Sequence, residues 1–415
     1  MDAQRLPGHG KLTTVDADPR KKIVFLIGSM EGGGAERVFI TLLRHLDRSH
    51  FQPYLVLLRA EGEFMCQVPK DVVVHTLHQS RRYPTLAGSF PLMRNLVQLL
   101  RRIRPQAVLS TGGMNLALAL ARPWLPRGTR VLIRECSVLG ARLNTDTRHP
   151  RLWRSLYRYL YQWADKVVCQ SDSMVREMSE KFHLRQQRPV RIYNPIDIDL
   201  VRELGRSGEN PYSGPGPQLV AAGRLSQEKG FDLLLAAMPE VVACLPHARL
   251  TILGQGPLRA ALAEQIQSLG LSGSVSLAGF QQNPWPYLYH ADLFVLPSRR
   301  EGFGNVLLEA LALDTPAVAV DCPGAMREIY GGNPAVRLVP AGTGLAEAIV
   351  AAYRANKYER ITPKSSPDWL AKFALKKVID EYSALFLDEK LKNGPLAQII
   401  HEKQTVIPTV YPRIS

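Results

Sequence analysis

The sequence predicts an α/β protein built from two doubly wound parallel sheets. Short apolar runs of strand type alternate with helical runs, which is the rhythm of βαβ units. A stretch rich in Gly, Pro and Ser at 210–217 interrupts this rhythm, and a second series of strands and helices follows it. At 415 residues the chain is long enough for two domains that each bury a core.

The first series opens with a buried-type strand at 22–28. Gly32, Gly33 and Gly34 come next, followed by a helix with apolar residues on one face. A later helix stops before Pro105, because proline cannot continue it. The further strands of this series are expected at 54–58, 72–77, 107–110, 131–133 and 167–169.

The second series predicts strands at 219–223, 250–254, 275–277, 293–296 and 317–320, and a terminal helix at 369–387. The predicted division is a polar tail at 1–20, a first domain at 21–193, a linker at 194–217, a second domain at 218–365, a terminal helix at 366–387 and a tail at 388–415.

The most informative stretch is 293–309, where a strand ends at Pro297, a turn follows and a helix opens near Asn305. Parallel sheets place ligands at such junctions, and the free amides of the first helical turn suit a phosphate. Gly302 and Gly304 let a ligand approach the backbone. Glu301 and Glu309 would repel a phosphate but accept hydroxyls, so the simplest ligand is a nucleotide-sugar.

The segment Glu301-Gly302-Phe303-Gly304, with Glu309 as the second glutamate after seven intervening residues, resembles the signature of retaining glycosyltransferases of family 4. This resemblance implies the GT-B fold, with two Rossmann-like domains that face a central cleft and a terminal helix that crosses back to the first domain. It also implies transfer of a hexose or N-acetylhexosamine, with retention, from a nucleotide-sugar, expected to be UDP-linked. The acceptor would be a glycan or a lipid-linked glycan, such as a polyprenyl-diphosphate glycan or a lipopolysaccharide precursor.

Other motifs extend the resemblance. Gly223-Arg224 to Lys229-Gly230 is similar to the family's diphosphate clamp, and the catalytic candidates are Glu301, Arg224 and Lys229. By resemblance, Glu301 holds the sugar hydroxyls and Glu309 the ribose hydroxyls. The residues expected to bind the donor are Gly33, Gly34, Arg224, Lys229, Gly254, Phe280, Gln281, Gly302, Phe303, Gly304, Asn305, Val306 and Glu309.

Two features depart from the family or from metal-dependent transferases. Many relatives carry a histidine near the sugar, but no histidine lies between His78 and His149, and Glu135 or Cys136 is expected in its place. Two D-x-D matches, at 16–18 and 197–199, lie in the polar tail and in the linker. We expect no catalytic metal and no cofactor apart from the donor.

Charge and cysteine usage suggest the compartment and the partners. The five cysteines are scattered and form no C-x-x-C pair, and no apolar run approaches the ~18 residues of a membrane span, so a cytoplasmic protein is expected. Residues 81–166 hold a net charge of +13 out of +15, which implies an anionic partner. The basic, aromatic segment 150–163 suits either an anionic membrane surface, at the inner membrane face, or a core helix with a solvated arginine face.

Three other functions compete with sugar transfer. A UDP-sugar 2-epimerase-like enzyme would share the fold but need no acceptor. A dinucleotide oxidoreductase would need G-x-G-x-x-G, and the spacing from Gly28 fails. A nucleic-acid-binding protein could use the basic segment, although no nucleic acid is expected. The sugar and the oligomeric state stay open.

Overall fold

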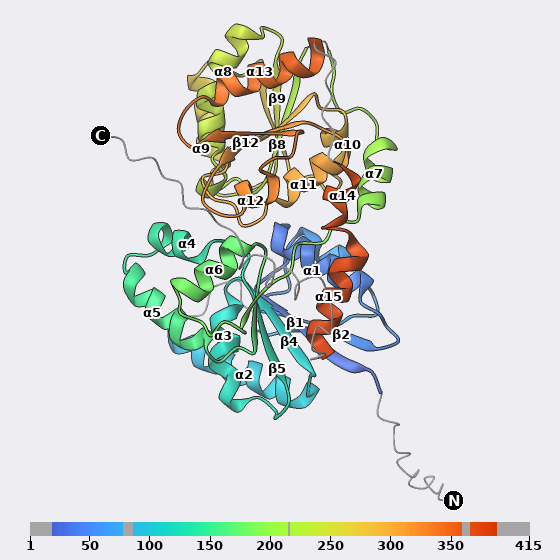
Figure 1. Cartoon of the computed structure of the whole chain (residues 1–415), viewed down its shortest axis with the longest axis vertical. Coiled ribbons are helices and arrows are strands. Elements are labelled where there is room, and N and C mark those ends of the chain that lie inside the picture. Colours follow the sequence, from blue (N-terminus) through green and yellow to red (C-terminus); the bar gives the residue numbers. More distant parts are fainter. Residues whose placement is uncertain (1–18, 78–85, 215, 359–365, 388–415) are drawn as a thin grey trace, which may run out of the picture.

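The computed structural model describes residues 19–77, 86–214, 216–358 and 366–387 (Figure 1). Within these ranges the strands form two parallel sheets, one with seven strands and one with six. Figure 1 shows two lobes, one above the other, each with helices on both faces of its sheet. This is the predicted fold class. No helix in the described part combines the length and the apolar character that a membrane span requires.

The seven-stranded sheet has the order β3-β2-β1-β4-β5-β6-β7. Its strands are β1 (Lys21–Ile27), β2 (Phe51–Leu57), β3 (Val73–Thr76), β4 (Ala107–Thr111), β5 (Arg130–Arg134), β6 (Lys166–Cys169) and β7 (Pro189–Arg191). The helices of this half are α1 (Gly34–His45), α2 (Leu86–Ile103), α3 (Met114–Ala121), α4 (Leu139–Asp146), α5 (Pro150–Tyr161) and α6 (Asp172–Glu180), with the 3-10 turns η1 (Glu63–Gln67) and η2 (Arg122–Trp124).

The six-stranded sheet has the order β10-β9-β8-β11-β12-β13. Its strands are β8 (Gln218–Ala222), β9 (Arg249–Leu253), β10 (Val275–Gly279), β11 (Leu293–Leu296), β12 (Ala317–Asp321) and β13 (Val336–Pro340). The remaining helices are α7 (Ile198–Arg206), η3 (Gln227–Lys229), α8 (Phe231–Cys244), α9 (Arg259–Ser268), α10 (Trp285–Tyr289), α11 (Asn305–Ala312), α12 (Met326–Tyr330), α13 (Leu345–Tyr358), α14 (Pro367–Ala371) and α15 (Leu375–Leu387).

Two edge strands, β7 and β13, are absent from the sequence-based prediction. β7 has three residues and begins with Pro189, and β13 follows Pro334 and is only partly buried. Short edge strands lack the continuous apolar run that marks central strands of a parallel sheet. The stretch expected as a linker also contains α7, whose Val201 is buried in the core of the second lobe.

The central strands are buried on both faces, as a parallel sheet covered by helices requires. Along β1, Val24 and Leu26 face a core that includes residues of α2, α3 and α5. Ile23 and Phe25 face the opposite core, which α1 and α15 cover. Successive strand residues point to opposite faces, so one strand contributes to both cores.

The C-terminal segment forms two helices where one was expected. In α14, Trp369 Nε1 donates a hydrogen bond to the Ile329 carbonyl of the second lobe. After Phe373 the chain turns into α15, which lies beside β1 and β2 of the first lobe (Figure 1). There Phe386 packs edge-on against Phe25 and Phe51, with ring centroids 5.9 and 6.1 Å apart. We therefore call β1–β7, α1–α6 and α15 the first domain, and β8–β13 with α7–α14 the second domain.

Removing this anchor should destabilise the first domain. Phe386→Ala deletes a fully buried ring, and such truncations lower the free energy of unfolding by about 3–5 kcal/mol. Lys376→Ala, on the exposed side of the same helix, should change it by less than about 0.5 kcal/mol. Chemical denaturation followed by circular dichroism measures both variants, and equal effects would show that α15 does not depend on this packing.

Candidate functional site

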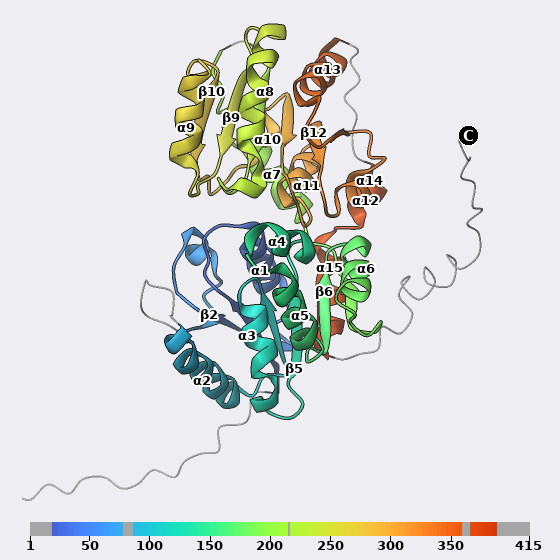
Figure 2. The ribbon, with the colours of Figure 1, turned by 90° about the vertical axis from the view of Figure 1, so that its left-hand side faces the viewer.

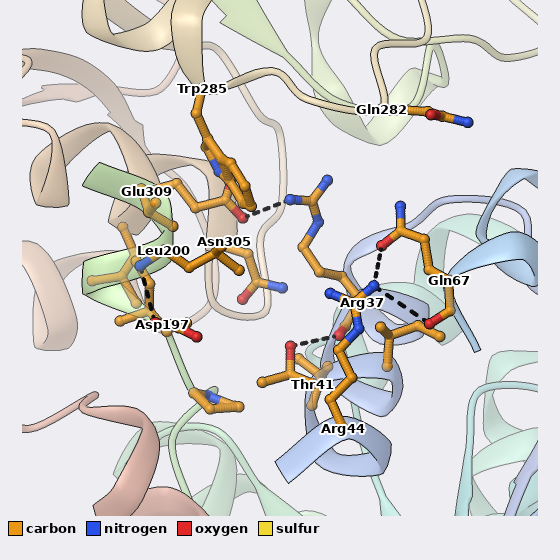
Figure 3. Close-up of a pocket in the computed structure, with 16 residues that line it drawn as sticks. Arg37, Thr41, Arg44, Gln67, Asp197, Leu200, Gln282, Trp285, Asn305 and Glu309 are labelled. Carbon is orange, nitrogen blue, oxygen red and sulfur yellow. Dashed lines mark hydrogen bonds and ion pairs between the residues drawn. The ribbon is translucent and has the colours of Figure 1, made fainter. Parts of the chain in front are cut away.

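The site lies where the carboxyl ends of the two sheets face each other. All neighbouring strands are parallel, so the loops after β8, β9 and β11 share one edge of the second sheet, and the loops after β1 and β5 share one edge of the first. Residues from both domains line a pocket between them, from α1 on one side to α10 and α11 on the other (Figure 3). This is the edge at which parallel sheets bind ligands.

The loop after β11 ends in a glycine that starts α11. Gly304 has φ +81° and is the N-cap of the helix, a conformation that favours glycine. Its carbonyl accepts a hydrogen bond of 2.9 Å from the Tyr330 hydroxyl, which fixes the turn. The amides of Asn305 and Val306 belong to the first turn of α11, where backbone N–H groups have no partner within the helix. The predicted helix start after Gly304 is therefore present.

Two of the three predicted catalytic residues meet. Lys229 Nζ lies 2.7 Å from Glu301 Oε2, and Ser298 Oγ donates to the same oxygen at 3.0 Å. Lys229 follows β8 and Glu301 follows β11, and these strands are neighbours in the sheet. Both side chains are largely buried, which strengthens the attraction between opposite charges. Glu301 is thus oriented by a cation and a hydroxyl.

The third predicted catalytic residue points across the cleft. Arg224 Nη2 lies 3.3 Å from Glu31 Oε2, in the loop after β1 of the first domain. Arg224 remains 60% exposed, and an exposed pair of this kind contributes only about 0–1 kcal/mol. A phosphate could therefore take over the Arg224 guanidinium at little cost.

Glu309 is held by two residues that the sequence did not single out as ligands. Its Oε2 accepts a hydrogen bond of 3.0 Å from Trp285 Nε1, and its Oε1 lies 3.4 Å from Arg37 Nη1 (Figure 3). Arg37 Cζ lies 5.3 Å from the ring centroid of Phe64 and 5.6 Å from that of Trp285. Arg37 belongs to α1, so this cation crosses between the domains. In the sequence, the only indication of this role is that Arg37 closely follows the glycine loop.

The predicted glycine loop forms the other wall. Gly33 is the N-cap of α1, and a Cβ added there would lie 2.5 Å from the Glu36 carboxylate. Burial raises the pKa of Glu36. A Cβ added at Gly34 would lie 2.9 Å from Asn305 Nδ2, which donates to the Gly34 carbonyl at 3.1 Å. This loop touches the start of α11 directly.

Four predicted donor ligands have mainly packing roles in this structure. A Cβ at Gly254, where φ is +137°, would clash with the Gly223 carbonyl, so this glycine lets two loops touch. Phe280 packs against Phe64 with ring centroids 5.8 Å apart. Gln281 Nε2 donates to the Ala278 carbonyl at 2.9 Å. The ring of Phe303 is buried next to those of Tyr193 and Phe373, so it lines the core and not the cleft.

The two candidates for the missing histidine differ in position. Glu135 is fully buried, and its Oε1 accepts hydrogen bonds from the Tyr161 hydroxyl and, at 3.2 Å, from Asn115 Nδ2. It therefore points into the layer of α3 and α5, away from the cleft. Cys136 contributes its carbonyl, against which Gly302 packs. Burial raises the pKa of the Cys136 thiol, and Glu135 adds to this, so the thiol stays protonated at neutral pH.

Of the two D-x-D matches, the structure describes the one at 197–199. Asp197 caps α7, accepting a hydrogen bond of 3.1 Å from the Leu200 amide. Asp16 and Asp18 lie outside the described residues. In the ranges that the structure covers, no three His, Cys, Asp or Glu side chains gather in a way that could hold a metal ion.

Comparison with known proteins gives matches over both halves. A model of glycosyltransferase family 4 matches residues 32–200, and a model of glycosyl transferases group 1 matches residues 216–355, together about three quarters of the chain. A Campylobacter jejuni N-acetylgalactosamine-N,N'-diacetylbacillosaminyl-diphospho-undecaprenol 4-alpha-N-acetylgalactosaminyltransferase is 27% identical over 75% of this chain and 84% of that protein. The lipopolysaccharide core biosynthesis glycosyltransferase LpsE of Rhizobium meliloti is 33% identical over 53% of this chain and 64% of that protein.

Solved structures share the whole architecture. Alr3699/HepE of Anabaena in complex with UDP and glucose superposes with a TM-score of 0.70 at 20% identity, over 89% of this chain and all of that one. WaaG, a glycosyltransferase involved in lipopolysaccharide biosynthesis, gives 0.67 at 16% identity, over 88% of this chain and 99% of that one. These similarities show the GT-B fold.

Closure of the cleft should depend on the absence of a side chain at Gly302. Gly302→Ala would push a methyl group into the Cys136 carbonyl, so the domains should move apart and the radius of gyration from small-angle X-ray scattering should rise. Gly113→Ala is the matched control, because nothing lies within 4 Å of a Cβ there and its φ of −62° suits alanine. An unchanged radius for Gly302→Ala would contradict close contact between these loops.

Proposed function

Because the chain belongs to the glycosyltransferases that the two family models describe, we propose that it moves a hexose or N-acetylhexosamine from a UDP-sugar to a glycan or lipid-linked acceptor. The observation that supports this most is the Lys229–Glu301 pair beside the amide-bearing start of α11, with Glu309 one turn further along. A cation, free amides and two carboxylates suit a diphosphate with hydroxyl-bearing rings on either side.

In the proposed reaction the protein acts through electrostatics. Lys229, Arg224 and the first-turn amides of α11 stabilise the charge that develops on the departing diphosphate. Glu301 accepts hydroxyls of the transferred sugar, and Glu309 accepts those of the ribose. The cations supply the positive charge that a divalent metal would otherwise bring. The departing phosphate takes the proton of the acceptor hydroxyl, which attacks on the same face, so the configuration is retained.

Both glutamates are paired with cations in this structure, so donor binding has to exchange partners. Lys229 can turn from Glu301 to the diphosphate while the sugar hydroxyls replace it on the carboxylate. At Glu309, the ribose hydroxyls replace Arg37, whose 3.4 Å contact is long for an ion pair. In each exchange, two hydrogen bonds replace one contact between charges. Breaking the two ion pairs therefore costs little free energy.

The relatives support the choice of donor and acceptor. Three solved complexes of HepE contain UDP, UDP with glucose, or UDP-glucose. The name of the Campylobacter relative includes a diphospho-undecaprenol, and that of LpsE refers to lipopolysaccharide core biosynthesis. Transfer to a lipid-linked glycan at the cytoplasmic membrane face is therefore the function that we propose.

A thermal-shift panel of nucleotide-sugars, followed by a transfer assay, tests this function. UDP and UDP-sugars should raise the melting temperature of the wild type, while NAD should not. Lys229→Met and Glu301→Gln should lower the transfer rate by about 10²–10³, the usual cost of removing one group that stabilises developing charge. Lys376→Ala, a charge change on the exposed side of α15, should keep the wild-type rate.

The same assay separates the competing functions. Product formed from the donor alone, without acceptor, would favour an epimerase. Stabilisation by NAD or by nucleic acid, with none by any nucleotide-sugar, would contradict the proposal. Glu309→Gln adds a further check, because it should weaken the UDP-dependent shift and leave binding of a polyanion unchanged.

The outer surface of α5 fits a membrane as the site of the acceptor. Three of its residues, Tyr157, Leu160 and Tyr161, are buried, whereas Leu152 is 68% exposed and Tyr159 62% exposed. Trp153 and Leu156 are partly exposed on the same helix, and exposed arginines stand at 151 and 158. Apolar side chains flanked by arginines suit the surface of an anionic bilayer. Helix α5 contacts α3 and α4, and Figure 2 shows α4 at the end of the first domain that faces the second.

Vesicle co-sedimentation tests this partner. The wild type should sediment with vesicles that contain anionic lipids and much less with zwitterionic vesicles, and salt should weaken binding because arginines contribute. Replacing Leu152 and Tyr159 by serine should reduce the bound fraction several-fold, since each exposed apolar group adds to insertion. Leu233→Ser, an equally simple change on α8, should have no effect. If the wild type does not sediment with anionic vesicles, the proposal of a membrane partner is wrong, although sugar transfer can still occur.

A further inference from the structure

We propose that Asn194 is a positioning residue that sets how the two domains close around the donor. Asn194 lies between β7 and α7, where the chain passes from the first domain to the second. Its side chain is the middle member of a chain of hydrogen bonds that joins β5, the start of α11 and the start of α1. The inference rests on the proposed function only in its consequence for turnover.

The series of hydrogen bonds begins at a buried cation. Arg134, at the end of β5, is only 1% exposed and is one of the largest fully buried side chains in the described residues. Its Nη2 donates a 2.5 Å hydrogen bond to Asn194 Oδ1. Asn194 is itself only 3% exposed, so solvent water can form few hydrogen bonds with the side chain of Arg134 or of Asn194. A buried guanidinium needs acceptors, and losing one is expensive.

Two further bonds continue from Asn194 into the second domain and back. Asn194 Nδ2 donates to Asn305 Oδ1 at 2.6 Å, and Asn305 Nδ2 donates to the Gly34 carbonyl at 3.1 Å. Asn305 is the first residue of α11, directly after Gly304. Gly34 is the first residue of α1. The starts of the two helices that border the cleft are therefore tied together by the Asn305 amide, which Asn194 of the inter-domain segment holds in place.

Arg134, at the buried end, determines which group donates and which accepts in each of these hydrogen bonds. Arginine can only donate hydrogen bonds, so the oxygen of Asn194 must face Arg134. The nitrogen of Asn194 then faces Asn305, which must accept with its oxygen. That leaves the nitrogen of Asn305 for the Gly34 carbonyl, which can only accept. No amide in the chain can be turned without placing two acceptors, or two donors, opposite each other.

The backbone around Asn194 holds the side chain in place. Pro195 follows it and restricts the Asn194 backbone to extended conformations. The Ile196 amide donates to the Phe373 carbonyl at 3.0 Å, so the next part of the segment is fastened to the turn before α15. The close approach of Asn305 also requires glycine at 34. The last bond can therefore form only at one separation of the domains, which makes it a measure of closure.

Isosteric substitutions distinguish this role from general stabilisation. Asn194→Asp keeps an acceptor for Arg134 but has no donor for Asn305, whose amide must turn and then places its oxygen against the Gly34 carbonyl. Asn305→Asp accepts from Asn194 but likewise cannot donate to Gly34. Both changes keep the size of the side chain, and the first adds charge attraction to Arg134. Asn194→Ala is a poorer probe, because it removes an acceptor from a buried cation.

The matched control lies in the same segment. Asn210 Oδ1 accepts a 3.0 Å hydrogen bond from the Tyr212 amide at an exposed position. Asn210→Asp preserves that acceptor and adds the same charge to the chain. It should therefore reproduce any effect that comes only from one more carboxylate near the inter-domain segment.

The experiment compares the four full-length proteins by small-angle X-ray scattering without ligand and by donor kinetics. Asn194→Asp and Asn305→Asp should show a larger radius of gyration than the wild type at an unchanged or slightly altered melting temperature. Their KM for the UDP-sugar should rise about tenfold, equivalent to one lost hydrogen bond across the cleft, while kcat changes less. Asn210→Asp should match the wild type in both measurements.

Other outcomes would contradict the proposal. Wild-type scattering and KM for Asn194→Asp would overturn the proposal, as would equal effects of Asn210→Asp. A larger radius with an unchanged KM would also overturn it, because closure would then not matter for the donor. If the wild type transfers no sugar from any donor, the proposed function fails, and the scattering comparison still decides whether Asn194 sets the separation of the domains.

Discussion

The structure depends on close contact between backbones at the carboxyl ends of its sheets. Within the second domain, the loops after β8 and β9 touch because Gly254 has no side chain to strike the Gly223 carbonyl. Between the domains, Gly302 meets the Cys136 carbonyl in the same way. Because these positions carry no side chains, main-chain amides and a few charged groups are left to line the cleft. A site for a charged ligand therefore forms because these glycines have no side chains.

Opposite charges neutralise one another throughout the site. Lys229 pairs with Glu301 inside the second domain, whereas Arg37–Glu309 and Arg224–Glu31 cross between the domains. Removing one partner of a buried pair would leave an uncompensated charge, which is costly. A donor that brings both a diphosphate and hydroxyl groups can satisfy the cation and the carboxylate together. Ligand exchange at the two cross-domain pairs would also change the contacts that hold the domains closed.

The basic helix and the cleft belong to one connected part of the first domain. Tyr161 of α5 donates to Glu135, the residue that directly follows β5, and Asn115 of α3 donates to the same carboxylate. On the neighbouring helix α4, Asp146 pairs with Arg300 of the second domain at 2.8 Å. The surface of α5 that we propose binds a membrane is therefore connected to residues beside the loop after β11, which would place a lipid-linked acceptor near the cleft.

The fold class and the local form of the site could be predicted from the amino-acid sequence, because both depend on residues that are close together in the chain. The alternation of strands and helices, the glycine before α11 and the spacing of Glu301 and Glu309 are local patterns. Tertiary structure alone decided which distant residues meet. Arg37 reaches Glu309 across 272 positions of sequence, and Glu135 turns into the core while Cys136 borders the cleft. Such contacts depend on how two domains pack, and no local periodicity records that packing.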